Sequence, residues 1–337
     1  MRLLFGLFII SSLIFSCNSS DTTPDVSNIK IQLTTQRFEK DLFAIDTANF
    51  NAAFEQLIAK YPSFGENFSS TILGADPKWS NDSVAAYAKG FVVAYKNVYD
   101  SSMLVFKDFT PYENEIKRGL QFVKYYFPNY KVPEKIITYI GPIDGFGDIV
   151  TDDALIVGLH LHLGKDFSLY KSELVQQTYP NYISSHFEPG NIPVNNLKNI
   201  VLDLFPEKTE DKSLVQQMVE KGKRLYVLSK ILPEADEYKM IGYTQVQLKD
   251  CYEHEKNIWD LFVQNNLLQT IDNNVIKNYI GESPKTQELG DASPGNIGTF
   301  AGWQIIKKYM KKYPETSLQK LMATDADTIF QEVKYKP

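Results

Sequence analysis

The spacing of apolar residues limits this chain to a mostly helical fold. In eight segments the apolar side chains recur every three or four residues, which places them on one face of an α-helix. These segments are residues 51–61, 82–98, 112–126, 193–205, 213–231, 243–264, 298–313 and 325–333. Side chains that can accept free amide hydrogens stand at the start of several of them, for example Ser213, Thr299 and Asp325. The pattern therefore predicts helices as the main elements.

Two other stretches are typical of β-strands. Residues 134–141 (EKIITYIG) are rich in β-branched side chains and end at a glycine before a proline. Residues 152–164 (DDALIVGLHLHLG) form a long apolar run in which polar and apolar residues alternate near the end. Many helices around a small sheet predict the α+β class. We find no internal repeat and no second linker, and expect a predominantly helical single domain over residues 29–337.

The first 17 residues have the layout of a bacterial secretion signal. Arg2 precedes a run of about 13 residues that is almost wholly apolar, below the roughly 20 needed to span a bilayer as a helix. Residues 14–17 (IFSC) match the lipobox of bacterial lipoproteins. A buried core helix would not run into the polar NSSDTTPDVSN that follows. We therefore expect residues 1–16 to be a signal peptide and Cys17 to carry a diacylglyceryl thioether, with acyl chains such as palmitate.

The residues after Cys17 suggest a tether and a location. Residues 17–28 are rich in serine, asparagine, aspartate, threonine and proline, and predict a flexible lipidated tether. Several acyl chains hold a protein stably on a membrane where one alone is marginal. No run of acidic residues follows Cys17, and Asp21 is only the fifth residue of the mature chain. We expect a lipid-anchored protein of the cell envelope, in the outer membrane and facing the periplasm.

Charge and cysteine content exclude several classes of protein. The full chain has 35 Lys+Arg and 41 Asp+Glu; removing Arg2 leaves 34 against 41, a formal charge of −7. An acidic chain without a basic stripe does not predict a nucleic-acid partner. With Cys17 lipidated, Cys251 is the remaining cysteine, so no internal disulfide is expected. It lies in a helical pattern, where we expect it to pack as a small hydrophobic residue; a nucleophilic role would need a base, and His254 is three residues on.

His160 and His162 are the residues that most suggest a metal site. On a strand, residues i and i+2 point to the same face, so both imidazoles could bind one ion. A third ligand would come from aspartates just upstream, which are Asp144, Asp148, Asp152 and Asp153. The alternative is a half-exposed face of a sheet on which each histidine has an ordinary hydrogen-bond partner. We expect no metal, cofactor or catalytic residue, and keep His160, His162, Asp152 and Asp153 as the candidate ligands.

Other chemical motifs are missing from the sequence. It contains neither HExxH nor GxSxG, and the carboxylate-rich loop 141–154 lacks the ligand spacing of an EF-hand. The glycines of residues 293–310 (SPGNIGTFAGWQIIKKYM) do not have the spacing of a phosphate-binding loop. We expect Gly302 instead to let its helix approach a neighbour closely.

Long strings of the sequence resemble one known family. They are RFEKDLFAID (37–46), YPSFGENF (61–68), GLHLHLGKDFSLY (158–170), IGYTQVQLKDCYEHEKNIWDLFVQNNLL (241–268), SPGNIGTFAGWQIIKKYM (293–310) and VKYKP (333–337). Together with the lipobox, they resemble the gliding-motility lipoprotein family GldB of the Bacteroidetes. The resemblance implies a component needed for surface gliding, coupled to the type IX secretion machinery, and implies no known catalytic residues.

The order of segments is also similar, more weakly, to zincin-like metallopeptidases. In those families an HExxH helix is followed by a Glu-Gly segment that supplies the third zinc ligand. Here residues 195–206 (NNLKNIVLDLFP) hold the place of that helix and contain no histidine. Lys221 precedes Gly222 where those enzymes have a glutamate. Because an ammonium group would repel Zn²⁺, the resemblance implies a zincin-like fold whose metal site is lost.

These observations favour an envelope lipoprotein required for gliding motility that docks protein partners and has no catalysis of its own. The rival interpretation is a metal-dependent hydrolase of envelope peptides or glycans that uses His160 and His162. A third is a module that binds a small ligand or peptidoglycan, suggested only by the 20 tyrosines and 21 phenylalanines.

Overall fold

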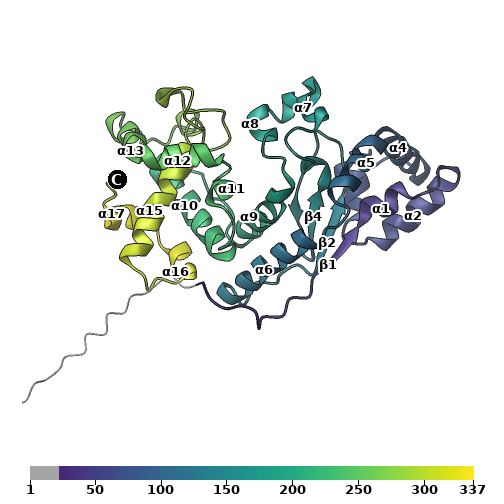
Figure 1. The fold of residues 1–337 in the computed structure, drawn as a ribbon, viewed down its shortest axis with the longest axis horizontal. Helices are drawn as coiled ribbons and strands as arrows, with labels where there is room; N and C mark the ends of the chain where they lie inside the picture. Colours follow the sequence, from purple (N-terminus) through teal and green to yellow (C-terminus); the bar gives the residue numbers. More distant parts are fainter. Residues whose placement is uncertain (1–22) are drawn as a thin grey trace, which may run out of the picture.

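A small sheet surrounded by many helices forms the structure, as the sequence predicts. The computed structural model describes residues 23–337. Figure 1 shows two halves that join near the middle of the chain. The first half holds the sheet and consists of β1 (Thr34–Arg37), α1 (Phe38–Phe43), α2 (Phe50–Lys60), α3 (Gly65–Asn67), α4 (Asn81–Ala94), α5 (Lys96–Val105), α6 (Thr110–Tyr126), β2 (Lys135–Tyr139), β3 (Ile149–Val150), β4 (Ala154–Gly158), α7 (Glu173–Thr178), α8 (Asn181–Ser184) and α9 (Ile192–Leu204).

The second half is helical in the described residues. It consists of α10 (Leu214–Ile231), α11 (Glu237–Ile241), α12 (Gln245–Glu253), α13 (Glu255–Gln264), α14 (Asn273–Ile276), α15 (Ile297–Lys312), α16 (Leu318–Ala323) and α17 (Ala326–Val333). Buried apolar residues of both halves belong to one continuous core. The fold is therefore α+β and predominantly helical.

The sheet brings separate parts of the chain to one edge. Its strand order is β1-β2-β4-β3; β1 and β4 are both parallel to β2, and β3 is antiparallel to β4. Parallel strands end at the same edge of a sheet. The residues that follow Tyr139 on β2 and Gly158 on β4, which pair in the sheet, are thus neighbours.

The strand predicted over residues 152–164 is wrong in its second half. β4 ends at Gly158, and residues Leu159–Leu161 form a short 3-10 helix, η3. The backbone N–H of His162 donates to the carbonyl of Leu159 at 3.0 Å, closing that turn. The apolar run continues past the strand because Leu159 and Leu161 are buried in the core, not because the backbone stays extended. His160 and His162 therefore do not share a strand face.

Two of the predicted helices are each divided into two. The segment 82–98 becomes α4 and α5, which meet at Tyr95, and the segment 243–264 becomes α12 and α13, which meet at His254. Neither junction contains a proline or glycine, so the apolar spacing alone predicted one continuous helix. At the first junction the Tyr95 hydroxyl accepts the backbone N–H of Ile143 at 3.1 Å, a contact between distant parts of the sequence.

The longest helix of the second half, α10, touches α15 backbone to backbone. A Cβ atom built on Gly302 would lie 1.8 Å from the carbonyl oxygen of Met218, and one built on Gly222 would lie 2.3 Å from the carbonyl oxygen of Gly302. No residue other than glycine fits such a crossing without a shift of the helices. The predicted close approach at Gly302 is confirmed.

Most of the predictions made for the N-terminus concern residues that lie outside the described part of the chain. The predicted signal peptide of residues 1–16 and the predicted lipidation site Cys17 are outside them. Of the predicted tether, residues 23–28 are described, and Val26 is fully buried in the core. The packed part of the chain thus includes Val26, ahead of the boundary at residue 29. From residue 23 onward, no helix combines the length and the apolar character that crossing a membrane requires.

Candidate functional site

His160 is a buried residue of the sheet edge. Its Nδ1 accepts the backbone N–H of Gly141 at 3.1 Å, and its ring packs edge-on against Tyr139 with centroids 5.3 Å apart. A Cβ on Gly158 would lie 2.9 Å from the ring, so the glycine leaves room for it. Burial lowers the pKa of His160 to about 3, which keeps the ring neutral. Among the described residues its Nε2 has no hydrogen-bond partner.

His162 forms a separate, buried pair with Asp148. Its Nε2 lies 2.9 and 3.1 Å from the two carboxylate oxygens, and its Nδ1 lies 3.3 Å from the carbonyl oxygen of Glu188. The carboxylate of Asp148 also accepts the backbone N–H of Gly158 at 3.1 Å. Asn199 of α9 donates to the carbonyl of Asp148 at 3.0 Å. The pair thus fastens the loop before β3 to the end of β4 and to α9.

The four candidate metal ligands do not come together. Asp152 and Asp153 precede β4, whereas His160 and His162 follow it, so they lie at opposite ends of that strand. Asp153 is held by Lys135, whose Nζ lies 2.8 Å away, and by Ser63. Asp152 is exposed. The arrangement in which both histidines face one ion is wrong, because the strand ends before them. Within residues 23–337 no three histidine, cysteine or acidic side chains are grouped so as to hold a metal.

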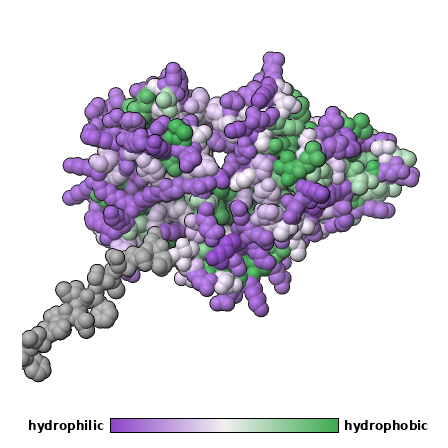
Figure 2. Space-filling view, in the orientation of Figure 1, coloured by the Kyte–Doolittle hydropathy of each residue, from purple (hydrophilic) through white to green (hydrophobic). Residues whose placement is uncertain are grey.

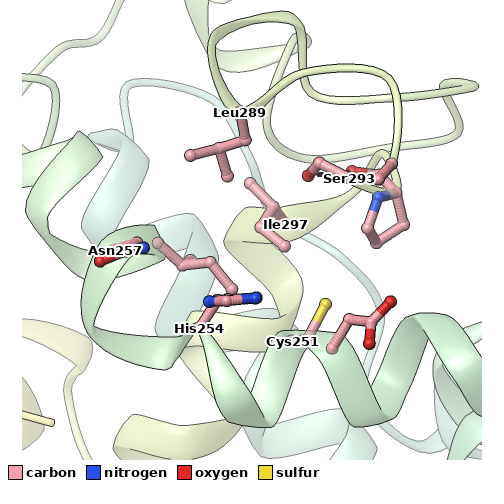
Figure 3. A pocket seen from close by; sticks show the side chains of 10 residues that line it. Cys251, His254, Asn257, Leu289, Ser293 and Ile297 are labelled. Atoms are coloured by element: carbon pink, nitrogen blue, oxygen red, sulfur yellow. Dashed lines mark hydrogen bonds between the residues drawn. The ribbon is translucent and has the colours of Figure 1, made fainter.

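Cys251 and His254 line a cavity of about 400 Å³ between α12 and the loop before α15. Figure 3 shows the Cys251 thiol beside the His254 ring, with Leu289 and Ser293 on the facing loop. Burial raises the pKa of Cys251 to about 12, so the thiol is protonated at neutral pH. Because the thiolate is the nucleophile, a buried and protonated thiol does not favour catalysis at this position. The prediction that Cys251 packs as a small buried residue is confirmed.

A second cavity, of about 310 Å³, lies where the two halves meet. We call it the Lys198 cleft. Its walls come from α9, α10, α11, the loop 281–296 and the start of α15. Figure 2 shows the surface notched between the two halves of the molecule. The lining combines five charged side chains, Lys198, Glu207, Lys221, Arg224 and Glu282, with six apolar ones, Val201, Leu202, Leu225, Leu228, Met240 and Ile241.

Most cations of the Lys198 cleft already have partners. Lys221 pairs with Glu207 at 2.8 Å. The guanidinium of Arg224 donates to the carbonyl oxygens of Phe205, Pro206 and Glu220, each within 2.9 Å. Lys198 differs: within the described residues its ammonium has neither a hydrogen-bond nor an ion-pair partner. Burial lowers the pKa of Lys198, although the nearby carboxylate of Glu282 opposes that effect.

Polar groups of the loop 281–296 complete the rim of this cleft. The side-chain oxygen of Asn296 accepts the backbone N–H of Gly281 at 3.1 Å and the hydroxyl of Thr299. Asn296 begins α15 with a left-handed φ of 56°. Its amide nitrogen has no hydrogen-bond partner among the described residues. The cleft therefore presents hydrogen-bond donors from two sides.

Lys198 was not among the residues singled out from the sequence, although a signal existed. It lies four residues after Val194 and three before Val201, both buried on the apolar face of α9. A lysine at that spacing lies on the side of the helix that packs against its neighbours, and Lys198 is partly buried. Helical spacing alone gives no indication that such a lysine lacks a partner.

The segments of the weaker zincin-like resemblance also border this cleft. α9 runs along it, and Lys221, in the place of the third ligand, is paired with Glu207. Gly222 beside it is required for the contact with Gly302. Nothing in the comparisons below supports a zincin-like relationship.

Comparison with known proteins gives one family. A family model described as gliding motility protein GldB matches residues 19–337. No curated protein and no solved structure matches the chain.

Proposed function

The chain belongs to the GldB family of gliding motility proteins, and from this premise we propose that it is an outer-membrane lipoprotein of the gliding machinery that docks protein partners and catalyses no reaction. Its partners in this proposal are other envelope proteins of gliding and type IX secretion. It faces the periplasm and is held by acyl chains on Cys17.

Exposed apolar side chains on two neighbouring helices, and on the turn that precedes the first of them, carry the docking proposal. We call this surface the α4–α5 face and define it by Trp79, Tyr87, Val93, Leu104 and Val105. The exposed fraction is 64% for Val93 and 86% for Leu104, and the rings of Trp79 and Tyr87 contact each other edge-on at 5.3 Å. Figure 2 shows apolar residues gathered on the half of the molecule that holds these helices. Large apolar groups gathered on a surface mark a site of protein contact.

The residues that an enzyme would use have structural contacts instead. His160 and His162 are buried, and their hydrogen bonds hold the sheet edge together. Cys251 is buried and protonated. The rival function, a metal-dependent hydrolase that uses His160 and His162, is thus not favoured by any contact of these residues.

Two matched valines test the docking face. Val93→Asp places a charge on the α4–α5 face, whereas Val246→Asp places one on α12 in the other half, where the valine is 67% exposed. Because both positions are solvated, both variants should accumulate and unfold like the wild type. We expect Val93→Asp to abolish gliding and Val246→Asp to leave it intact. Normal gliding of Val93→Asp and of Leu104→Asp would remove the proposal.

The anchor needs a separate experiment. Cys17→Ala leaves no thiol for the diacylglyceryl group, so the protein should lose its radiolabelled palmitate and leave the membrane fraction. Gliding should stop because the docking face is no longer held at the membrane. A Cys17→Ala protein that still carries palmitate and sediments with outer membranes contradicts the anchoring site.

A further inference from the structure

An open apolar hollow of about 650 Å³ lies where α6, α9 and α16 end. We call it the α6–α16 hollow. Most of its wall is made by apolar residues, which are Phe127, Pro128, Leu204, Phe205, Met322 and Ala323. Among the described residues, no charged side chain belongs to this lining, whereas charged side chains line both the cavity beside Cys251 and the Lys198 cleft. The hollow is therefore suited to an uncharged, apolar occupant.

The polar groups of the hollow do not require a polar ligand. The hydroxyl of Tyr130 donates to Asp203 at 2.6 Å, and the side-chain amide of Gln319 donates to the carbonyl oxygen of Tyr126. Asn129, the remaining polar residue of the lining, is exposed and keeps its hydrogen bonds to water. Because these groups are already partnered or solvated, an apolar chain can cover the wall without leaving a buried donor unpaired.

The start of the described chain lies against α6, the helix that leads to the hollow. The side-chain amide of Gln121 donates to the carbonyl oxygen of Ile29 at 2.8 Å, and the charge of Arg118 acts on the carboxylate of Asp25. Beyond Gln121, α6 continues for five residues, about 8 Å at 1.5 Å per residue. The hollow is thus close to the place at which the chain enters its packed body.

An anchor at Cys17 can hold only a limited part of the surface at a membrane. Cys17 is six residues before Thr23, the first described residue. A fully extended chain of that length spans at most about 22 Å, and a packed body of this size has a radius of gyration of about 20 Å. In Figure 1 the described chain enters at the lower edge of the molecule, where α6 and α16 are, whereas α4 is at the far right. The anchor therefore keeps the side that holds the hollow next to the bilayer.

We propose that the α6–α16 hollow binds an acyl chain of a phospholipid from the membrane in which Cys17 is anchored. The proposal rests on the proposed lipid anchor, because the reach of the chain before Thr23 brings the hollow to the bilayer. This second contact fixes the orientation of the body. It turns the α4–α5 face away from the bilayer, where protein partners can reach it.

Photocrosslinking from a labelled lipid provides the first test. The mature, lipidated protein is placed in phosphatidylethanolamine vesicles that contain a phospholipid with a diazirine at the end of one acyl chain, or, in a parallel sample, on its headgroup. Mass spectrometry should find acyl-chain adducts on residues 127–130 and 322–323, and none at Val246 of α12, which is 67% exposed. The acyl chains of the protein itself carry no diazirine and give no adduct. No adduct in the hollow, or equal adducts from the headgroup probe, overturns the proposal.

Matched variants separate the hollow from the anchor. Ala323→Glu places a charge in the hollow, and Ala52→Glu places one on α2. Both alanines are exposed, so both variants should unfold like the wild type. A charge held against hydrocarbon is unfavourable, so Ala323→Glu should lower the yield of acyl-chain adducts by about fivefold, and Ala52→Glu should not change it. An unchanged yield in Ala323→Glu contradicts the site.

Sedimentation of the vesicles reports on the anchor in the same samples. A protein that sediments with the vesicles but gives no adduct in the hollow refutes the acyl-chain site and leaves the anchor standing. A protein that stays in the supernatant refutes the anchor and the acyl-chain site together.

Discussion

The crossing of α10 and α15 gives the sharpest test of how this fold is held together. Gly302→Ala would place a methyl group 1.8 Å from the carbonyl oxygen of Met218 and 2.4 Å from its carbonyl carbon. Real contacts of this kind are about 3.4 Å or longer, so the two helices must separate by roughly 1.5 Å. Both atoms belong to the backbone of a helix, so no side chain can turn away to relieve the clash.

The loss in free energy of unfolding follows from that separation of the helices. Overpacking a core costs about 1–3 kcal/mol and sometimes more, and here the upper end applies because rigid helices must move. Alanine has a higher helix propensity than glycine by about 1 kcal/mol, which offsets part of the cost. Buried residues such as Phe300 and Trp303 would also lose contacts. We expect Gly302→Ala to lower the free energy of unfolding by about 2–3 kcal/mol.

Gly90 is the matched control. It lies inside α4, is exposed, and a Cβ there would meet no atom within 4 Å. Gly90→Ala should therefore show only the propensity gain, an increase of about 1 kcal/mol. Urea unfolding followed by circular dichroism measures both variants against the wild type. A Gly302→Ala protein as stable as Gly90→Ala would refute the backbone contact.

Two further predictions concern buried titratable groups. In the folded protein the pKa of His160 is about 3, whereas in the unfolded chain it is near 6.5. Between these two values the unfolded state binds more protons than the folded state, so the free energy of unfolding falls as the pH is lowered. The control is His160→Asn, whose side-chain oxygen can still accept the N–H of Gly141. Relative to this variant, the free energy of unfolding of the wild type, measured in urea, should fall by about 1.4 kcal/mol between about pH 7.5 and 5.5. A difference between the two proteins that does not change with pH would contradict the assignment. Burial raises the pKa of Cys251 from 9.0 to about 12. At about pH 8 the native thiol should therefore react with iodoacetamide about a thousandfold more slowly than the thiol of the urea-unfolded protein, as followed by mass spectrometry. Equal rates would contradict its burial.

The candidate site shows where prediction from sequence succeeds and where it stops. Asp148 was among the aspartates predicted to lie near the histidines, and it does contact His162. The pair is nevertheless structural, because both side chains are almost fully buried at the sheet edge. Asp153 belongs to the same stretch of sequence but lies at the other end of β4, beside Lys135. Proximity in sequence therefore did not give proximity in space.

The sequence by itself determined most of the helices and the strand at residues 135–139. Their apolar spacing reflects which residues face the core, and that property is local to each element. It also determined the close approach at Gly302, since a glycine inside an apolar helix has few other reasons to be there.

Only the tertiary structure decided where β4 ends, that His160 and His162 have different partners, and that Lys198 has none within the described residues. Each of these depends on residues distant in sequence. Gly141 and Gly158 define the position of His160, and α10, α11 and the loop 281–296 enclose Lys198. Local spacing carries no information about such contacts because they form only when separate elements pack together.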